Sequence, residues 1–252
     1  MHLGLTLFFF KLKKFPFLKN PISNIELYYT PLQNISKNKI LIEGEEYTHI
    51  TKVMRHSVKN ELYVTDGKGK IYSGLISKID KKNMELEIGN ILTFENRFKN
   101  ISFCIPKLKS NDRFEFALEK CAELGITNFI IFDSERTISR TNKIERWEKI
   151  LISAMKQSLH SFLPNIEMHK FNNIVNFQGN KVAFEQSASK KINELINIPD
   201  EAYYFIFGPE GGLSERELNF FEGENIYKIS DNRLRTETAV VSAATLITSK
   251  IN

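Results

Sequence analysis

The sequence has little cysteine and no long hydrophobic segment, and these absences exclude several classes of protein. Its only cysteines, Cys104 and Cys121, lie in segments that read as a strand and a helix, so neither a disulfide framework nor a zinc site is expected. The apolar run at residues 5–10 ends at Lys11 and is far too short to cross a bilayer. We therefore expect a cytoplasmic protein, with neither a membrane nor a metal among its partners.

The first 24 residues differ from the rest of the chain. Lysines follow the apolar run instead of preceding it, and no small-residue cleavage site is evident, which does not fit a signal peptide. We expect residues 1–24 to be a disordered or non-native extension whose removal leaves activity intact. An organellar targeting segment and a surface anchor are the open alternatives.

Basic charge is concentrated in the N-terminal part of the chain. The formal net charge is +5, of which residues 1–100 carry +6 and residues 101–252 carry −1. Because phosphates respond to the local field, this distribution permits a nucleic-acid partner without requiring one. With 42% hydrophobic residues, the chain can form a core in one large or two medium domains.

Short strands with turn signals predict a small β-barrel in residues 25–95. The expected strands are residues 26–30, 39–42, 61–65, 70–79 and 83–92. An Asp-Gly pair at residues 66–67 supplies the positive φ that a tight hairpin needs. Apolar residues at helical spacing predict one helix, over residues 45–55, between the second and third strands.

Strands alternate with helices in residues 98–252, and this alternation predicts an α/β domain whose parallel sheet is covered on both faces. The expected strands are residues 101–105, 129–132, 181–185, 203–207 and 226–229. The expected helices are residues 112–124, 144–159, 189–196, 214–221 and 237–251. The last helix has almost no polar face, so the sheet or a second subunit must bury it.

A glycine-rich turn follows the most apolar of these strands. The turn contains Phe207, Gly208, Pro209, Glu210, Gly211 and Gly212. Ser214 and Glu217 then form a capping box that starts the next helix. The glycines allow the backbone to approach a nucleotide-like cofactor at the carboxyl end of the sheet. The same residues are also compatible with a tight strand-to-helix turn that binds nothing.

A second polar loop leads from a strand into the last helix. It contains Ile229, Ser230, Leu234, Arg235, Thr236, Glu237 and Thr238. Thr236 could merely cap the helix, and Glu237 could merely complement its dipole. Arg235 has no comparable local role, although an ion pair between helices would also explain it.

These two loops, about twenty residues apart, resemble the ribosomal RNA small subunit methyltransferase E family of the SPOUT superfamily. The resemblance rests on Gly208-Pro209-Glu210-Gly211-Gly212-Leu213-Ser214 followed by Leu234-Arg235-Thr236-Glu237-Thr238-Ala239. Similar stretches occur at residues 119–125, 134–136 and 146–158, and His49 and residues 53–55 also match the family pattern. His160, where family members usually have arginine, and Lys59-Asn60 in place of a glycine are departures.

The resemblance implies a fold, a cofactor and a partner. Family members join a PUA-like RNA-binding β-barrel to a SPOUT domain with a deep trefoil knot, and they act as homodimers. The implied cofactor is S-adenosylmethionine, and the implied product is N3-methyluridine in the decoding region of 16S ribosomal RNA, either free or in the assembled small subunit. The implied cofactor-binding residues are Glu185, Phe207, Gly208, Pro209, Glu210, Gly211, Gly212, Ile229, Ser230, Leu234, Thr236 and Thr238.

Arg235 and Glu237 are the candidate catalytic residues. A guanidinium beside the uracil favours the anion at N3 and can donate a hydrogen bond to a uracil oxygen, and Glu237 could accept the N3 proton. The candidate RNA-binding residues are Arg55, Arg136, Arg140 and Gln157, although each could simply be a solvated surface residue. The cofactor loops do not encode the target, so methylation of another RNA nucleotide and a non-catalytic RNA-binding role in ribosome assembly stay open.

Overall fold

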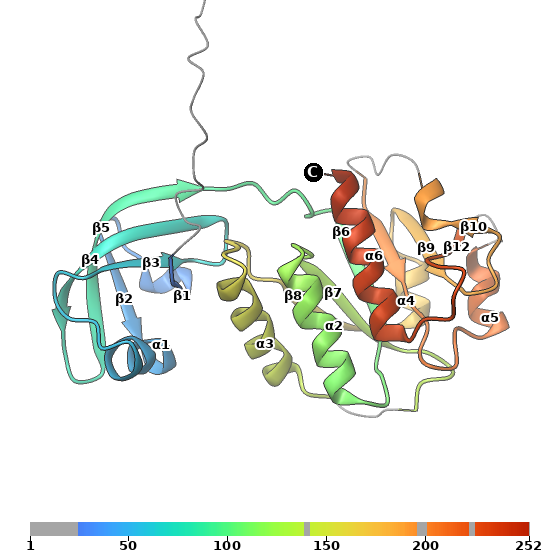
Figure 1. The fold of residues 1–252 in the computed structure, drawn as a ribbon, viewed down its shortest axis with the longest axis horizontal. Helices are drawn as coiled ribbons and strands as arrows, with labels where there is room; N and C mark the ends of the chain where they lie inside the picture. Colours follow the sequence, from blue (N-terminus) through green and yellow to red (C-terminus); the bar gives the residue numbers. More distant parts are fainter. Residues whose placement is uncertain (1–24, 139–141, 196–200, 222–224, 252) are drawn as a thin grey trace, which may run out of the picture.

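The computed structural model describes residues 25–138, 142–195, 201–221 and 225–251. The extension expected in residues 1–24 lies outside the described residues. The described chain forms a five-stranded sheet followed by a seven-stranded sheet, and the two stand beside each other (Figure 1). No helix in the described part of the chain is long and apolar enough to cross a membrane.

The N-terminal sheet is curled and has the strand order β1-β3-β4-β5-β2. Its strands are β1 (Leu27–Tyr29), β2 (Lys39–Glu43), β3 (Glu61–Thr65), β4 (Lys70–Ile79) and β5 (Asn83–Thr93). A short 3-10 helix, η1 (Leu32–Asn34), connects β1 to β2. Thr30 Oγ1 donates to the Leu41 carbonyl oxygen at 3.0 Å, which links the two edges of the sheet. The predicted PUA-like barrel is present as this curled sheet, around a core that contains Ile40, Leu62 and Leu86.

The helix predicted over residues 45–55 is instead two short pieces. These are α1 (Gly44–Thr48) and a π-helical turn, η2 (His49–Val53). The Met54 amide donates to the His49 carbonyl at 3.0 Å, a wider turn than the α-helical one. Arg55 then has a φ of 57°, a left-handed conformation that ends the helix and turns this exposed side chain away from the helical path.

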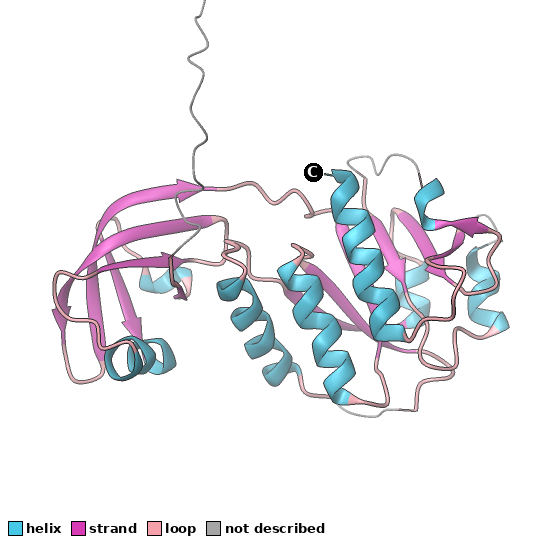
Figure 2. Ribbon diagram, viewed as in Figure 1, coloured by secondary structure: helices cyan, strands magenta, loops and turns pink. Residues whose placement is uncertain are grey.

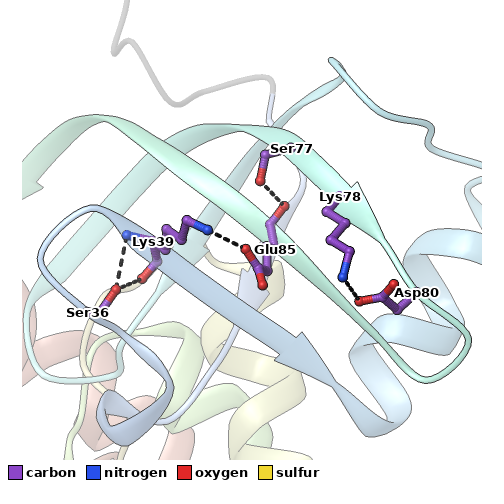
Figure 3. A network of polar contacts seen from close by, with 6 residues as sticks. All are labelled: Ser36, Lys39, Ser77, Lys78, Asp80 and Glu85. Atoms are coloured by element: carbon purple, nitrogen blue, oxygen red, sulfur yellow. Dashed lines mark hydrogen bonds and ion pairs between the residues drawn. The ribbon is translucent and has the colours of Figure 1, made fainter.

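A polar network lies on the outer face of the curled sheet (Figure 3). Lys39 Nζ of β2 lies 2.7 Å from Glu85 Oε2 of β5, and Ser77 of β4 donates to the Glu85 carbonyl at 3.1 Å. Lys78 pairs with Asp80 at the turn between β4 and β5. The lysines are well exposed, so these ion pairs add little stability. They mark this face as the solvated side of the sheet.

The C-terminal sheet is parallel throughout, with the order β10-β12-β9-β11-β6-β7-β8. Its strands are β6 (Ile101–Pro106), β7 (Asn128–Asp133), β8 (Asn165–Lys170), β9 (Asn180–Phe184), β10 (Lys190–Lys191), β11 (Tyr203–Ile206) and β12 (Ile226–Lys228). The helical segments are α2 (Asn111–Glu123), α3 (Ile144–Gln157), α4 (Phe171–Val175), η3 (Ile192–Glu194), α5 (Glu215–Leu218), η4 (Asn219–Phe221) and α6 (Thr236–Ile251). The α/β class predicted for this part is therefore confirmed.

Helices cover both faces of this sheet. Successive strand residues point to opposite sides, so apolar side chains on each face need a layer of helices to bury them. Helices α2, α3 and α6 lie along one face (Figure 2), where Phe103, Phe129 and Phe205 belong to one buried cluster. On the other face, Cys104 and Ile206 pack in a second cluster with residues of α4 and η4. The expectation of a sheet covered on both faces is thus correct.

Two expectations about the C-terminal elements need correction. The helix predicted over residues 189–196 is wrong within the described residues, because Lys190 and Lys191 form β10 beside β12 and only a 3-10 turn follows. Pairing at the sheet edge outweighs the local helical spacing. Strand β8 and helix α4 were not expected at all, since β8 is an edge strand rich in polar residues.

The two sheets are joined through the turn between β3 and β4. Gly67 and Gly69 have φ values of 67° and 104°, which agrees with the predicted Asp-Gly hairpin. The Gly69 amide donates to the Ser161 carbonyl at 2.9 Å, and the Leu163 amide donates to the Gly67 carbonyl at 3.0 Å. The hairpin therefore docks against the segment that follows α3.

Candidate active site

The carboxyl ends of β9, β11 and β12 open onto one pocket of about 790 Å³. Because these strands are neighbours in a parallel sheet, the loops that follow them meet at the same edge. The predicted cofactor residues that line the pocket are Glu185, Phe207, Gly208, Pro209, Glu210, Gly211, Gly212, Ile229, Ser230, Leu234 and Thr236. Thr238 is exposed on α6 and does not line it.

The two predicted loops are bonded to each other. Thr236 Oγ1, at the first residue of α6, donates to the Gly208 carbonyl at 3.2 Å. Thr236 is buried, so this bond is shielded from water. The hydroxyl that the sequence suggested as a simple helix cap therefore joins the glycine-rich loop to the loop of residues 229–238.

The glycine-rich loop is compact enough to require glycine at one position. A Cβ on Gly208 would lie 2.8 Å from the Leu213 amide nitrogen and 2.9 Å from the Gly212 carbonyl carbon. Gly212 has a φ of 71°, and the Gly212 amide closes a turn by donating to the Pro209 carbonyl at 2.8 Å. Close backbone packing thus sets the shape of this pocket wall.

Arg136 lies against the glycine-rich loop. Its Nη1 donates to the Gly211 carbonyl at 2.8 Å and to the Leu213 carbonyl at 3.2 Å. Arg136, which the sequence predicted to bind RNA, is also one of the residues that line the pocket. Its contact with RNA stays a prediction.

Glu217 connects the loop after β7 to the end of the glycine-rich loop. Its Oε2 accepts from the Ser214 amide at 2.8 Å, as the predicted capping box requires, and also from Ser134 Oγ at 2.9 Å. Its Oε1 accepts from the Glu135 amide at 3.0 Å. The carboxylate is buried and fully engaged, so one side chain fixes both the start of α5 and the loop after β7.

Glu237 and Arg113 form an ion pair beside the pocket. Arg113 Nε lies 3.5 Å from Glu237 Oε1, and the Glu237 side chain is only 11% exposed. Arg113 comes from the first turn of α2 and lines the pocket, whereas Glu237 lies just behind its lining. The pair connects the beginnings of α2 and α6.

Arg235 and Arg233 are the available cations of the pocket. Both line it and both are exposed. Neither guanidinium forms a hydrogen bond or an ion pair with another described residue. An arginine without an internal partner keeps its donors for a ligand. The alternative of an inter-helix ion pair is therefore met by Arg113 and Glu237, not by Arg235.

The other predicted RNA-binding residues lie elsewhere. Arg55 is exposed on the N-terminal domain, and Gln157 is exposed at the end of α3. Arg140 lies outside the described residues. His160 Nε2 is 3.1 Å from the Glu123 carbonyl at the end of α2, so the departure at this position places the histidine ring against a helix C-terminus.

Sequence reasoning missed Arg113 as a pocket residue. A signal for it was available, because Arg113 opens the helix that follows β6, and the carboxyl ends of all parallel strands face the same edge of a sheet. Gln186 was also missed; its Nε2 donates to the Ser230 carbonyl at 3.3 Å and the Asp231 carbonyl at 3.2 Å. Only the fold shows that this amide braces the second loop.

The described residues contain no group of three or more His, Cys, Asp and Glu side chains that could hold a metal ion. Cys104 and Cys121 are both buried, and burial raises the pKa of each thiol. A buried, protonated thiol is a poor nucleophile. The polar chemistry of the pocket therefore comes from arginine, glutamate, hydroxyl and backbone groups.

Known proteins share this arrangement. The profile of the RNA methyltransferase domain matches residues 95–248, and that of the RNA methyltransferase PUA domain matches residues 42–89. Ribosomal RNA small subunit methyltransferase E from Helicobacter pylori (strain ATCC 700392 / 26695) is 28% identical over 232 residues, which cover 86% of this chain and 97% of that protein.

Solved structures agree with the sequence matches. Ribosomal RNA small subunit methyltransferase E from Neisseria gonorrhoeae, crystallised with S-adenosyl methionine, superposes with a TM-score of 0.79 at 28% identity, over 89% of this chain and 97% of that one. A probable rRNA-methyltransferase from Porphyromonas gingivalis gives a TM-score of 0.80 at 26% identity, over 90% and 98% of the two chains. An α/β domain with a parallel sheet beside a PUA-like sheet is thus the fold that this chain shares with an rRNA methyltransferase. The chain belongs to the RNA methyltransferase family, within the ribosomal RNA small subunit methyltransferase E group that the sequence resembled.

Proposed function

We propose that this protein transfers the methyl group of S-adenosylmethionine to N3 of a specific uridine in the decoding region of 16S ribosomal RNA. The observation that carries the proposal is the hydrogen bond from Thr236 to Gly208, which makes two separate loops into one pocket. The Neisseria relative, which has the same fold, was crystallised with S-adenosyl methionine. The target position is inferred from the family resemblance.

The pocket suits this cofactor. Its volume of about 790 Å³ is in the range of small-molecule sites. The glycine-rich loop offers backbone groups without side-chain obstruction, and Ser230, Glu185 and Thr236 add polar atoms. When bound, S-adenosylmethionine supplies a methyl group already activated by a sulfonium leaving group. The protein must therefore mainly orient the base and manage its proton.

Arg235 is the principal catalytic residue of the proposal. Uridine N3 carries a proton at neutral pH, and each pKa unit between the base and the medium costs about 1.4 kcal/mol. Arg235 lines the pocket and has no partner among the described residues. Its guanidinium can donate to a uracil oxygen and stabilise the negative charge that develops as N3 loses its proton.

Glu237 is the proposed acceptor of the N3 proton. The ion pair with Arg113, which lines the pocket, holds its carboxylate next to the pocket lining, and a general base needs such a fixed orientation. Glu237 also lies in the first turn of α6, where a negative charge complements the helix dipole. The structural role and the proton-acceptor role are compatible, because the same orientation serves both.

We also propose that residues 25–95 bind RNA while residues 98–252 hold the cofactor. Arg55 and Gln157 supply contacts outside the pocket, as Arg140 does in the sequence-based prediction. The substrate is the RNA itself or the assembled small subunit, encountered in the cytoplasm. The trefoil knot implied by the family resemblance belongs to this proposal too.

A homodimer is the proposed working unit. Val240, Ala243, Ala244 and Ile247 bury one side of α6 within the subunit. The other side bears Thr238, Thr245 and Ser249, which are exposed, with Val241 only partly buried. This nearly uncharged outer side fits a second subunit better than it fits water.

Methyl transfer from tritiated S-adenosylmethionine tests the function. Purified protein is incubated with assembled small subunits and with naked 16S RNA, both from a strain that lacks the modification, and the labelled nucleoside is then identified. Label in 3-methyluridine at one position supports the proposal. Label in another nucleoside would show a different RNA target, and cofactor binding without transfer to any RNA would favour a non-catalytic role in ribosome assembly.

A further inference from the structure

The geometry points to Arg136 as a positioning residue for the cofactor loop, held in place by Ser134 and Glu217. This inference rests on the proposed function and deepens it. Arg136 would fix the backbone of residues 211–213 in the conformation that receives S-adenosylmethionine.

The contacts of Arg136 are directed at main-chain atoms. Its Nη1 donates to the carbonyls of Gly211 and Leu213, and a Cβ on Gly211 would lie 3.5 Å from Arg136 Cδ. The arginine therefore packs directly against the backbone of the loop. Because a guanidinium stays charged at all accessible pH values, these bonds do not depend on protonation.

The buried carboxylate of Glu217 makes this contact specific. It accepts hydrogen bonds from Ser134 Oγ and the Glu135 amide, directly before Arg136, and from the Ser214 amide, directly after the glycine-rich loop. The chain segment that carries Arg136 and the loop that Arg136 contacts are thus both bonded to the Glu217 carboxylate. Glycines lose much backbone entropy when they are ordered, so a loop containing Gly208, Gly211 and Gly212 gains from such an external brace.

A brace and an RNA contact predict different kinetics. If Arg136 orders the loop, its removal reduces the fraction of protein that is competent to bind the cofactor, and the apparent affinity falls by that fraction. Chemistry in the loaded enzyme then changes little. If Arg136 instead contacts RNA, cofactor affinity is unchanged and the KM for RNA rises.

The test compares Arg136→Met with Arg136→Lys and with a matched control, Arg216→Met, on the exposed side of α5. Calorimetric titration with S-adenosylmethionine should show binding about tenfold weaker for Arg136→Met. A charge-assisted hydrogen bond that is shielded from water changes affinity by about tenfold or more, and partial solvation of Arg136 keeps the combined effect of its two bonds near that value. Arg136→Lys should recover part of the loss. The control should bind like the wild type. In methyl transfer, the KM for the cofactor should rise while kcat stays within about twofold.

Ser134→Ala is the second variant, because it removes one anchor of the loop without touching the pocket. We expect cofactor binding about two- to fivefold weaker, with a melting temperature lowered by a few degrees because the buried Glu217 carboxylate loses one of its donors. Normal cofactor affinity in Arg136→Met and Ser134→Ala would overturn the brace while leaving the proposed function intact. Failure of the wild type to bind S-adenosylmethionine would overturn both.

Discussion

Gly208 occupies a position that no side chain can share. The atoms that a Cβ would meet at 2.8–3.0 Å all belong to the backbone of Gly212 and Leu213, and backbone cannot swing aside as a flexible side chain can. Gly211, three residues on, has nothing closer than Arg136 Cδ at 3.5 Å. Two glycines of one loop therefore have different requirements.

Gly208→Ala should abolish measurable binding of S-adenosylmethionine and destabilise the fold by about 1–3 kcal/mol, as overpacking does. Gly211→Ala, the matched control, should bind the cofactor within about threefold of the wild type, because an ordinary van der Waals contact is all that it adds. Calorimetry and urea denaturation measure the two effects. Equal behaviour of the two variants would show that the loop is looser than its geometry indicates.

Arg235→Ala should reduce kcat by about 10²–10³, the usual effect of removing one donor that stabilises developing charge. Cofactor affinity should change little, because the glycine-rich loop and Thr236 stay in place. Single-turnover methyl transfer and calorimetry separate the two quantities. Arg216→Ala, which removes an equal charge outside the pocket, is the control; near-normal turnover of Arg235→Ala would exclude this residue from the mechanism.

At the level of elements, the sequence indicated most strands correctly because their side chains alternate or are uniformly apolar. Strand β11, with Phe205 and Ile206 buried on opposite faces, is the clearest case. Strand β8 escaped notice because only Ile166 and Met168 of its six residues are apolar, too short an alternation to stand out from a loop. The segment at residues 189–195 misled because a 3-10 turn buries Ile192 and Leu195 at a spacing that a helix would also use.

The candidate site was predictable to the extent that its residues follow parallel strands. Gly208 and Thr236 each lie just beyond a strand end, so the sheet rule brings them together. The second use of the Glu217 carboxylate was not predictable, since Ser134 lies about 80 residues away in the chain. A capping box explains Glu217 locally, and nothing in the sequence shows that its carboxylate has acceptor capacity left for another loop.

The ion pair between α1 and α3 joins the two domains. Lys156 Nζ lies 2.5 Å from Glu46 Oε1, and both side chains are largely buried, at 25% and 15% exposure. Glu46 Oε2 has no hydrogen-bond partner among the described residues. Loss of Lys156 would leave an uncompensated carboxylate in a poorly solvated place.

Lys156→Met should therefore lower the free energy of unfolding by about 1–2 kcal/mol, below the value for a fully buried pair because solvent still reaches both groups. Adding Glu46→Met should restore most of the loss, since the pair then becomes apolar. Lys149→Met, which breaks the exposed pair with Glu45, should leave stability unchanged. Urea denaturation of the wild type and the three variants tests this, and a double variant no more stable than Lys156→Met would contradict it.

Across the whole molecule, the proposed RNA contact and the pocket lie far apart. Helix α1, which precedes Arg55, stands at the opposite end from α5, which follows the glycine-rich loop (Figure 1). Residues 1–24 carry +4 of the formal net charge, residues 25–100 carry +2 and residues 101–252 carry −1. Because neither domain has a large net charge, phosphate attraction outside residues 1–24 must come from individual exposed cations such as Arg55.

Arg55→Ala should accordingly weaken RNA binding without altering the pocket. One lost phosphate contact should reduce the slope of log affinity against log salt by about 0.7–0.9, while cofactor affinity and kcat at saturating RNA stay unchanged. Lys82→Ala, which removes an exposed charge from the turn between β4 and β5, is the matched control and should leave the slope as it is. Filter binding at several salt concentrations provides the measurement. Equal slopes for Arg55→Ala and the wild type would mean that RNA reaches the pocket without contacting this end of the molecule. The proposal that residues 25–95 bind RNA while residues 98–252 hold the cofactor would then be wrong.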